Sequence, residues 1–115
     1  MEFDQYYVVL LKKGPNWTEA ISLELKELQK QHLAHLTNLF EQGLLRVAGP
    51  VQDHSEMSNT RGISIFPIEA AESLDALKTL VEADPMFQIG HLAADYLTWY
   101  VPQGSNLLPN HNVDS

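Results

Sequence analysis

Apolar residues recur at two different spacings along the chain, and these spacings predict alternating strands and helices. The aromatic and β-branched run at 5–12 (QYYVVLLK) predicts a strand, and Gly14 and Pro15 end it in a turn. From about Ser22 to Gln42, leucines recur every three or four residues, which predicts a helix with one buried stripe. That stripe consists of Leu25, Leu28, His32, Leu36 and Leu39.

Two further strands are predicted after this helix. Gly43 is the expected left-handed residue at the helix end, and residues 44–51 (LLRVAGPV) then predict a short strand. The polar residues 52–61 predict a loop, and residues 62–69 (GISIFPIE) predict a third strand. Within it, Pro67 has no amide hydrogen to donate, which indicates a sheet edge or a bulge at that position.

A second helix and a last strand complete the pattern. The helix is predicted to begin near the N-cap residue Ser73 and to stop at Asp84, because Pro85 cannot continue the hydrogen-bond ladder. Residues 91–101 (HLAADYLTWYV) predict the last strand. The residues of the second helix expected to face inward are Leu74, Leu77 and Val81.

The order β-α-β-β-α-β predicts an α+β fold of the ferredoxin-like type, a four-stranded antiparallel sheet with both helices on one face. Both faces of the sheet are apolar, since the first strand offers Tyr6, Val8 and Leu10 on one side and Tyr7, Val9 and Leu11 on the other. A sheet half open to water would be polar on its outer face. We therefore expect a homodimer in which two sheets pack face to face.

Composition narrows the class of protein. The 115 residues fit one domain, predicted at 1–101, followed by a tail at 102–115 that we expect to be flexible or docked on a neighbouring subunit through Leu107 and Leu108. The chain has no cysteine, no apolar run long enough to span a membrane and no secretion signal, so we expect a cytoplasmic protein. The formal charge of −8 and the scattered basic residues argue against nucleic acid as a partner.

His32 occupies a position in the apolar stripe where a leucine is expected. It has two interpretations, an ordinary half-buried histidine or a proton carrier that projects into a cleft, where an imidazole can take and return a proton. The second interpretation needs a partner that selects the tautomer, and the best candidate is Asp84. Asp84 before a proline is also a common helix stop, so neither residue establishes a site alone.

The remaining candidates are weaker. His32 and His35 have the spacing of a metal pair, but no third ligand is apparent and His35 is expected to point away from the stripe, so no metal or cofactor is predicted. His91 has no obvious partner, and Arg61 is interpreted as a solvated hairpin residue rather than an anion binder. The others are interpreted as solvated loop residues (His54, His111) or as packing on the sheet (Tyr96, Trp99).

Two segments resemble a known family. The run HLAHLTNLFEQGLLRVAGP (32–50) is similar to the helix-to-strand signature of YCII-related proteins, and SLDALKTLVEADPM (73–86) resembles the second helix of that family, which ends in Ala-Asp-Pro. The resemblance covers about residues 5–101. It implies the dimeric α+β barrel superfamily and an active site in which His32 faces Asp84, with Gly49 and Pro50 close by as ligand contacts.

The resemblance also suggests classes of reaction. A related member of the family acts as a dehydrochlorinase on a chlorinated aromatic, and muconolactone isomerase shares the wider superfamily. A His32–Asp84 dyad would suit proton abstraction, with elimination or isomerisation of a small cyclic or aromatic acid. A non-enzymatic ligand-binding or regulatory module, and a purely structural domain, remain alternatives, because a fold alone does not define a function.

Overall fold

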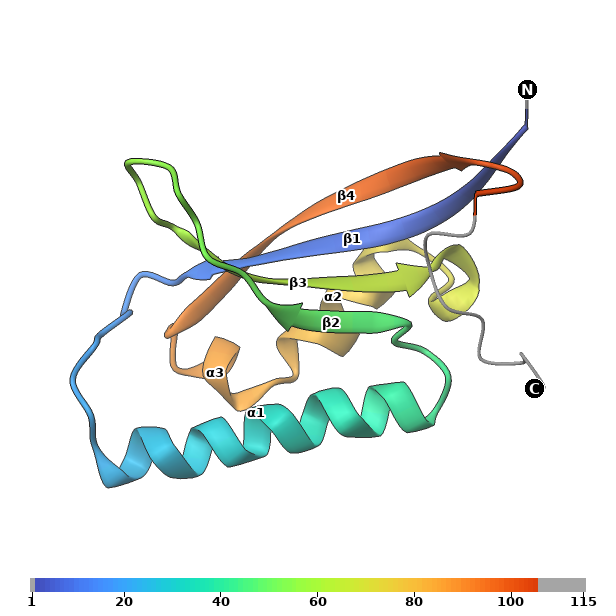
Figure 1. Ribbon diagram of the computed structural model, residues 1–115. Helices are drawn as coiled ribbons and strands as arrows, with labels where there is room; N and C mark the ends of the chain where they lie inside the picture. Colours follow the sequence, from blue (N-terminus) through green and yellow to red (C-terminus); the bar gives the residue numbers. More distant parts are fainter. Residues whose placement is uncertain (1, 106–115) are drawn as a thin grey trace, which may run out of the picture.

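The computed structural model describes residues 2–105, which form one antiparallel sheet with its helices on one side (Figure 1). The strands are β1 (Phe3–Lys13), β2 (Val47–Pro50), β3 (Thr60–Pro67) and β4 (Leu92–Pro102). The helices are α1 (Leu23–Glu41), α2 (Leu74–Glu82) and α3 (Pro85–Gln88), with one 3-10 turn at Ile68–Ala70. The sheet order is β2-β3-β1-β4 and every pairing is antiparallel, so the predicted ferredoxin-like fold is confirmed.

The predicted helix boundaries agree with local capping. The Ser22 side chain accepts a hydrogen bond from the Leu25 amide at 3.1 Å and so starts α1. Gly43 follows α1 with φ +75°, a conformation that glycine adopts without strain. Ser73 accepts from the Ala76 amide at 3.1 Å and starts α2 as expected.

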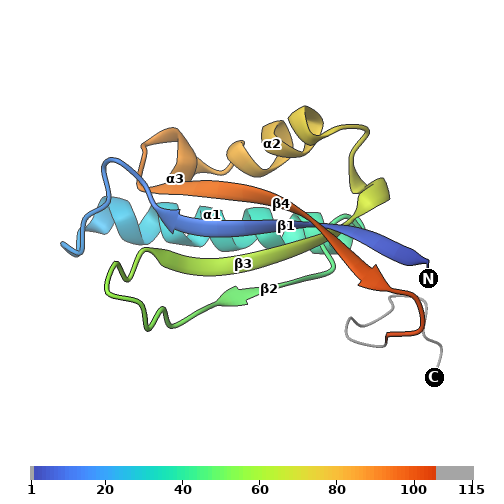
Figure 2. The ribbon, with the colours of Figure 1, turned by 90° about the horizontal axis from the view of Figure 1, so that it is seen from above.

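The core lies between the sheet and the helices. Seen from above, α1 runs behind the strands β1 and β3 (Figure 2). His32 and Leu39 are the buried residues of α1, and the other three members of the predicted stripe, Leu25, Leu28 and Leu36, are partly buried. Burial of these apolar side chains is the main favourable term in folding. The core consists of Tyr7, Val9, Leu11, Leu39, Leu45, Phe66, Leu77 and Val81.

Several sequence-based expectations are wrong in detail. Strand β3 is an interior strand and the irregularity between β1 and β3 is at Leu11/Lys12, not at Pro67; at Pro67 itself, β3 pairs with β1 alone, as at an edge. Pro67 is tolerated because it is the last residue of β3, beyond the point where pairing with β2 ends at Ile65. Leu74 does not face inward but is exposed at the start of α2. The strand predicted at 44–51 is shorter, because Leu44 and Leu45 turn into the core.

The region after α2 contains an element that the sequence analysis missed. The main helix ends at Glu82, but a new short helix, α3, begins at Pro85 with Asp84 as its N-cap. Proline suits a first helical position because its missing amide hydrogen would have no partner there. Pro85 therefore both stops one helix and starts the next.

The outer face of the sheet carries the side chains that alternate away from the helices. Tyr6 and Trp99 pair across β1 and β4 with ring centroids 6.3 Å apart, and Val8 lies opposite Leu97. The face is not uniformly apolar, because Lys12 and Asp95 form an exposed ion pair at 2.7 Å near one end. The strand β4 continues to Pro102, one residue into the predicted tail. The pair Leu107 and Leu108 lies outside the described residues.

Within residues 2–105, no helix has both the length and the apolar content needed to cross a bilayer.

Candidate functional site

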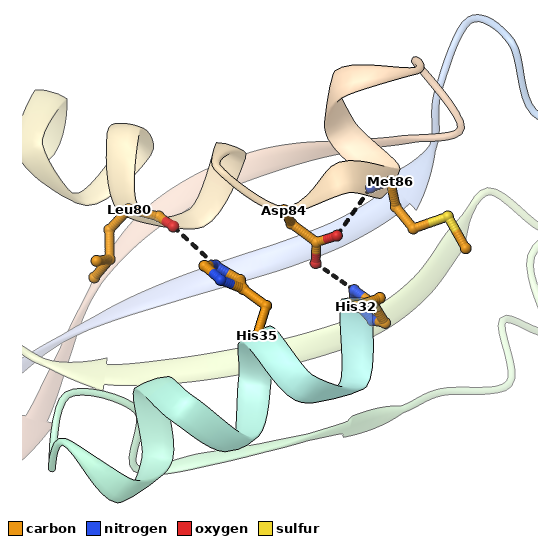
Figure 3. A network of polar contacts seen from close by, with 5 residues as sticks. All are labelled: His32, His35, Leu80, Asp84 and Met86. Atoms are coloured by element: carbon orange, nitrogen blue, oxygen red, sulfur yellow. Dashed lines mark hydrogen bonds and ion pairs between the residues drawn. The ribbon is translucent and has the colours of Figure 1, made fainter. Parts of the chain in front are cut away.

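His32 on α1 and Asp84 before α3 meet in the interior (Figure 3). The Nδ1 atom of His32 donates a hydrogen bond to Oδ2 of Asp84, and the two side chains are nearly removed from solvent, with 8% of His32 and 2% of Asp84 exposed. The predicted meeting of these residues is confirmed. An unpaired buried carboxylate would be strongly unfavourable, so each group compensates the desolvation of the other.

The backbone of α3 holds the carboxylate in position. Asp84 is the N-cap residue of α3, and its Oδ1 atom accepts a hydrogen bond from the Met86 amide at 2.9 Å. The second oxygen is left for His32. A carboxylate acceptor selects the tautomer of His32 with the proton on Nδ1, so the lone pair of the neutral ring lies on Nε2.

A cleft of about 710 Å³ opens between α1 and the strands β2 and β3. His32 lines this cleft. Asp84 does not line it, and the His32 imidazole lies between the carboxylate and the cleft. Leu33 and Phe40 are apolar side chains of α1 that stay about half exposed and line the cleft. A volume of this size is typical of a site for a small molecule.

Gly49 and Pro50 lie at the opposite wall of the cleft, on the edge strand β2, and both are exposed. Gly62 pairs with Pro50 across β2 and β3 and is also part of the lining. The structure therefore brings Gly49 and Pro50 to the same cleft as His32. Their role as ligand contacts remains a prediction.

The sequence analysis missed a second group of side chains in the cleft. Trp17, which follows β1, stacks on His91 with ring centroids 4.3 Å apart and planes inclined by 26°. Both rings line the cleft, and burial lowers the pKa of His91 from its usual value of 6.5. The only sequence signal was a tryptophan inside a Gly-Pro turn, and nothing in the local pattern connects it with a histidine so far along the chain.

The segment 14–17 is attached to the residues around His91 by backbone hydrogen bonds. The Gly14 amide donates to the His91 carbonyl at 2.9 Å, and the Asn16 amide donates to the Gly90 carbonyl at 2.8 Å. The amide of His91 itself donates to the Met86 carbonyl at 3.0 Å. Since the Met86 amide binds Asp84, one residue of α3 holds both the dyad and the Trp17–His91 stack.

Three other candidate residues, His35, Tyr96 and His54, do not line the cleft. His35 is half-buried and donates from Nε2 to the Leu80 carbonyl of α2 at 3.0 Å. The Tyr96 hydroxyl donates to Glu82 at 2.6 Å, and burial, together with this carboxylate, raises the pKa of Tyr96. His54 is exposed in the loop before β3, and His111 lies outside the described residues.

Among residues 2–105, no three side chains of the types that usually bind metal lie together. The polar side chains that line the cleft carry imidazole, indole, guanidinium, amide and hydroxyl groups.

The sheet order, the helices on one face and the buried His–Asp pair define a small α+β protein of the ferredoxin-like type. Residues 6–99 match the family model described as the YCII-related domain. This match covers most of the chain, and the protein therefore belongs to the YCII-related family, as its sequence resemblance indicated. No curated protein matches the chain.

A solved structure with a similar fold is the 5-chloro-2-hydroxyhydroquinone dehydrochlorinase from Burkholderia phenoliruptrix AC1100, in complex with 2,5-dihydroxybenzoquinone. The two chains share 25% sequence identity, and the TM-score is 0.56. The match covers 82% of this chain and 92% of that chain.

Proposed function

We propose that this protein is a cofactor-independent enzyme, a lyase or isomerase, that acts on a small cyclic or aromatic acid. The observation that carries the proposal is the position of His32, which is bound on one side by a buried carboxylate and lines a cleft on the other. Such a pairing suits general acid/base catalysis, because the carboxylate orients the imidazole and stabilises its protonated form.

The proposed step begins with His32 Nε2 taking a proton from a carbon or hydroxyl of the ligand. The electron pair of the broken bond forms a new double bond, and either a leaving anion departs or the double bond shifts. In an isomerisation, the imidazolium returns its proton to another atom of the ligand; in an elimination, it loses the proton to water. Asp84 keeps its charge throughout and acts through His32, so it is a positioning residue.

The comparison with the dehydrochlorinase supports an elimination. That protein has a similar fold, and its name describes the loss of hydrogen chloride from a hydroxylated ring. In our proposal, Gly49 and Pro50 contact the ring of the ligand at the wall opposite α1, where backbone without a large side chain leaves room for it.

The test is turnover by matched variants. A panel of halogenated and non-halogenated hydroxylated rings, including 5-chloro-2-hydroxyhydroquinone, would be assayed for chloride release and for changes in absorbance. We expect His32→Gln to lower kcat by roughly 100-fold or more, which is the usual contribution of a general acid or base. Asp84→Asn should also lower kcat, because an amide does not stabilise the imidazolium.

The matched control is His35→Gln. His35 lies one turn along the same helix, is half-buried and binds a backbone carbonyl, but it does not line the cleft. Its replacement should leave kcat within about threefold of the parent protein, because His35 does not line the cleft and only a general acid or base in contact with the ligand contributes roughly 100-fold or more. Equal rates in the parent, His32→Gln and Asp84→Asn proteins would contradict the proposal. Saturable ligand binding without turnover in any protein would instead favour a non-enzymatic binding or regulatory module.

We also propose that the protein is a cytoplasmic homodimer whose sheets pack through their outer faces. The support is the apolar centre of that face, where Leu97 is half exposed beside Val8 and Trp99. A second copy would remove these side chains from water, which is favourable in proportion to the apolar area buried.

A further inference from the structure

The lining of the cleft differs in charge from the rest of the protein. The whole chain has fifteen acidic and seven basic residues. The described residues that line the cleft include two arginines, Arg46 and Arg61, but no aspartate or glutamate. A cleft with cations and no carboxylate attracts anions, and its low-dielectric walls strengthen that attraction.

The Trp17–His91 stack lies beside this positive charge. The guanidinium of Arg61 is 5.1 Å from the Trp17 ring centroid, within the range of a cation–π interaction. The same ring stacks on His91, so the Trp17 indole contacts both the Arg61 guanidinium and the His91 imidazole. Arg61 is exposed at its cleft position, so its charge is available to a ligand that enters from solvent.

Two ring nitrogens in this group have unused hydrogen-bonding capacity. Trp17 Nε1 and His91 Nδ1 are buried and have no hydrogen-bond partner within residues 2–105. Buried polar atoms are nearly always paired, and an unpaired one is unfavourable. Since both atoms are closed to solvent, a ligand oxygen can pair with them only after the side chains at this wall of the cleft adjust.

We propose that His91 and Arg61, arranged on Trp17, form the subsite that binds the anionic oxygen of a planar ring ligand while the reacting part of that ring faces His32. This proposal rests on the proposed function for the role of His32 and adds the residues that select the ligand. The oxygen belongs to a carboxylate or to an ionised ring hydroxyl, and both accept hydrogen bonds from imidazole, indole and guanidinium donors. The apolar side chains of α1 and β3 pack on the ring.

The first experiment measures binding without turnover. Benzoate supplies a carboxylate, 2,5-dihydroxybenzoquinone supplies ionisable ring hydroxyls, and benzamide is the neutral counterpart of benzoate. Calorimetric titration should show that at least one of the two anions binds roughly tenfold or more tightly than benzamide, since hydrogen bonds to charged groups are the stronger kind. Whichever anion binds more tightly identifies the source of the oxygen.

The second experiment uses a matched pair of variants. Lys13 also lies over the Trp17 ring, at 5.7 Å, but it does not line the cleft. Arg61→Gln should weaken anion binding by roughly tenfold. Lys13→Gln removes the same charge from the same ring and should change the affinity by less than about threefold. Benzamide should bind both variants as it binds the parent protein.

The two tryptophans provide an internal reference. The chain has Trp17 in the cleft and Trp99 on the outer face of the sheet. In an amide and indole NMR spectrum, the Trp17 indole resonance should move when an anion binds, and that of Trp99 should not. His91→Phe keeps an aromatic ring against Trp17 and removes both nitrogens, so it should weaken anion binding by roughly tenfold.

The inference is overturned if neither anion binds saturably, if benzamide binds as well as the anions, or if Arg61→Gln and Lys13→Gln have equal effects. Should His91→Phe fail to fold, the exposed Arg61 variant and the indole resonances decide the question. Selective anion binding without turnover would contradict the proposed function and support this subsite. Turnover that does not depend on Arg61 or His91 would support the proposed function and contradict this subsite.

Discussion

Asp84 and His32 are separated by 52 positions in the sequence, and their side chains are joined by a hydrogen bond in the interior of the protein. The carboxylate that receives His32 also caps α3 through the Met86 amide. One side chain therefore begins a helix and orients an imidazole. This double role connects the stability of the protein with the geometry of its candidate site.

Replacing Asp84 should destabilise the protein more than the loss of an ordinary helix cap. We expect Asp84→Ala to lower the free energy of unfolding by about 2–4 kcal/mol, because the cap is lost and two buried donors, on His32 and Met86, are left unpaired. Urea denaturation measures this change. The comparison is Ser73→Ala, which removes only the cap of α2 and should cost about 1 kcal/mol. Equal losses in the two variants would show that the bond to His32 contributes nothing to stability.

Gly14 is expected to tolerate no side chain. A Cβ atom there would lie 2.3 Å from the Gly90 carbonyl oxygen, which is backbone and cannot move aside alone. Gly14→Ala should lower the free energy of unfolding by about 1–3 kcal/mol, as overpacking usually does. It should also separate Trp17 from His91, which tryptophan fluorescence would detect.

The matched control for Gly14 is Gly49. A Cβ atom at Gly49 meets nothing within 4 Å, so Gly49→Ala should change the free energy of unfolding by less than about 0.5 kcal/mol. Because Gly49 lines the cleft, we expect this variant to change ligand affinity instead. A stable Gly14→Ala protein with native fluorescence would contradict the close approach of the two chain segments.

The pKa of His91 predicts how stability depends on pH. Burial lowers this pKa below 6.5, so between the two values the unfolded chain binds more protons than the folded one. The contribution of His91 to stability is therefore complete above about pH 6.5 and decreases as the pH falls through that window. The unfolding midpoint in urea, measured at about pH 7.5 and about pH 5.5, should fall less in His91→Phe than in the parent protein. Identical pH dependence in the two proteins would count against a buried neutral His91.

The proposed dimer predicts an effect of charge on the outer face of the sheet. Sedimentation velocity should show a dimer for the parent protein and a monomer for Leu97→Lys, because an unpaired lysine between two sheets is strongly unfavourable. Ile21→Lys is the control, since Ile21 is highly exposed before α1 and lies off the sheet. A monomeric parent protein at micromolar concentration would contradict the proposal.

Local sequence was sufficient for most of the secondary structure. The alternating residues of β1 and the leucine spacing of α1 predicted those elements, and Ser22 and Ser73 cap their helices as expected. The resemblance to the YCII-related family identified His32 and Asp84 as partners, and the structure places them together. These features depend on residues close in sequence or on a motif that recurs as a whole.

One error is local: Pro85 ends the pattern of α2, but with Asp84 as N-cap it also starts α3. The other errors arise where distant segments meet. Pro67 indicates an edge or a bulge, but the sequence does not show that β3 is an interior strand whose pairing with β2 ends before this proline. Arg61 was interpreted as a solvated hairpin residue, although it lies over Trp17 at the cleft.

The sequence by itself therefore determined most of the elements and their order, because periodicity, caps and turns act over a few residues. The pairing of His32 with Asp84 came from the family resemblance, which compares the two segments as a whole. Only the tertiary structure decided that α1 stands off β2 and β3 to leave a cleft, and that Trp17 reaches His91 through the close approach of Gly14 and Gly90. The physical reason is that strand order and helix packing bring together side chains that are far apart in the sequence, and the local sequence around each one does not predict the contact.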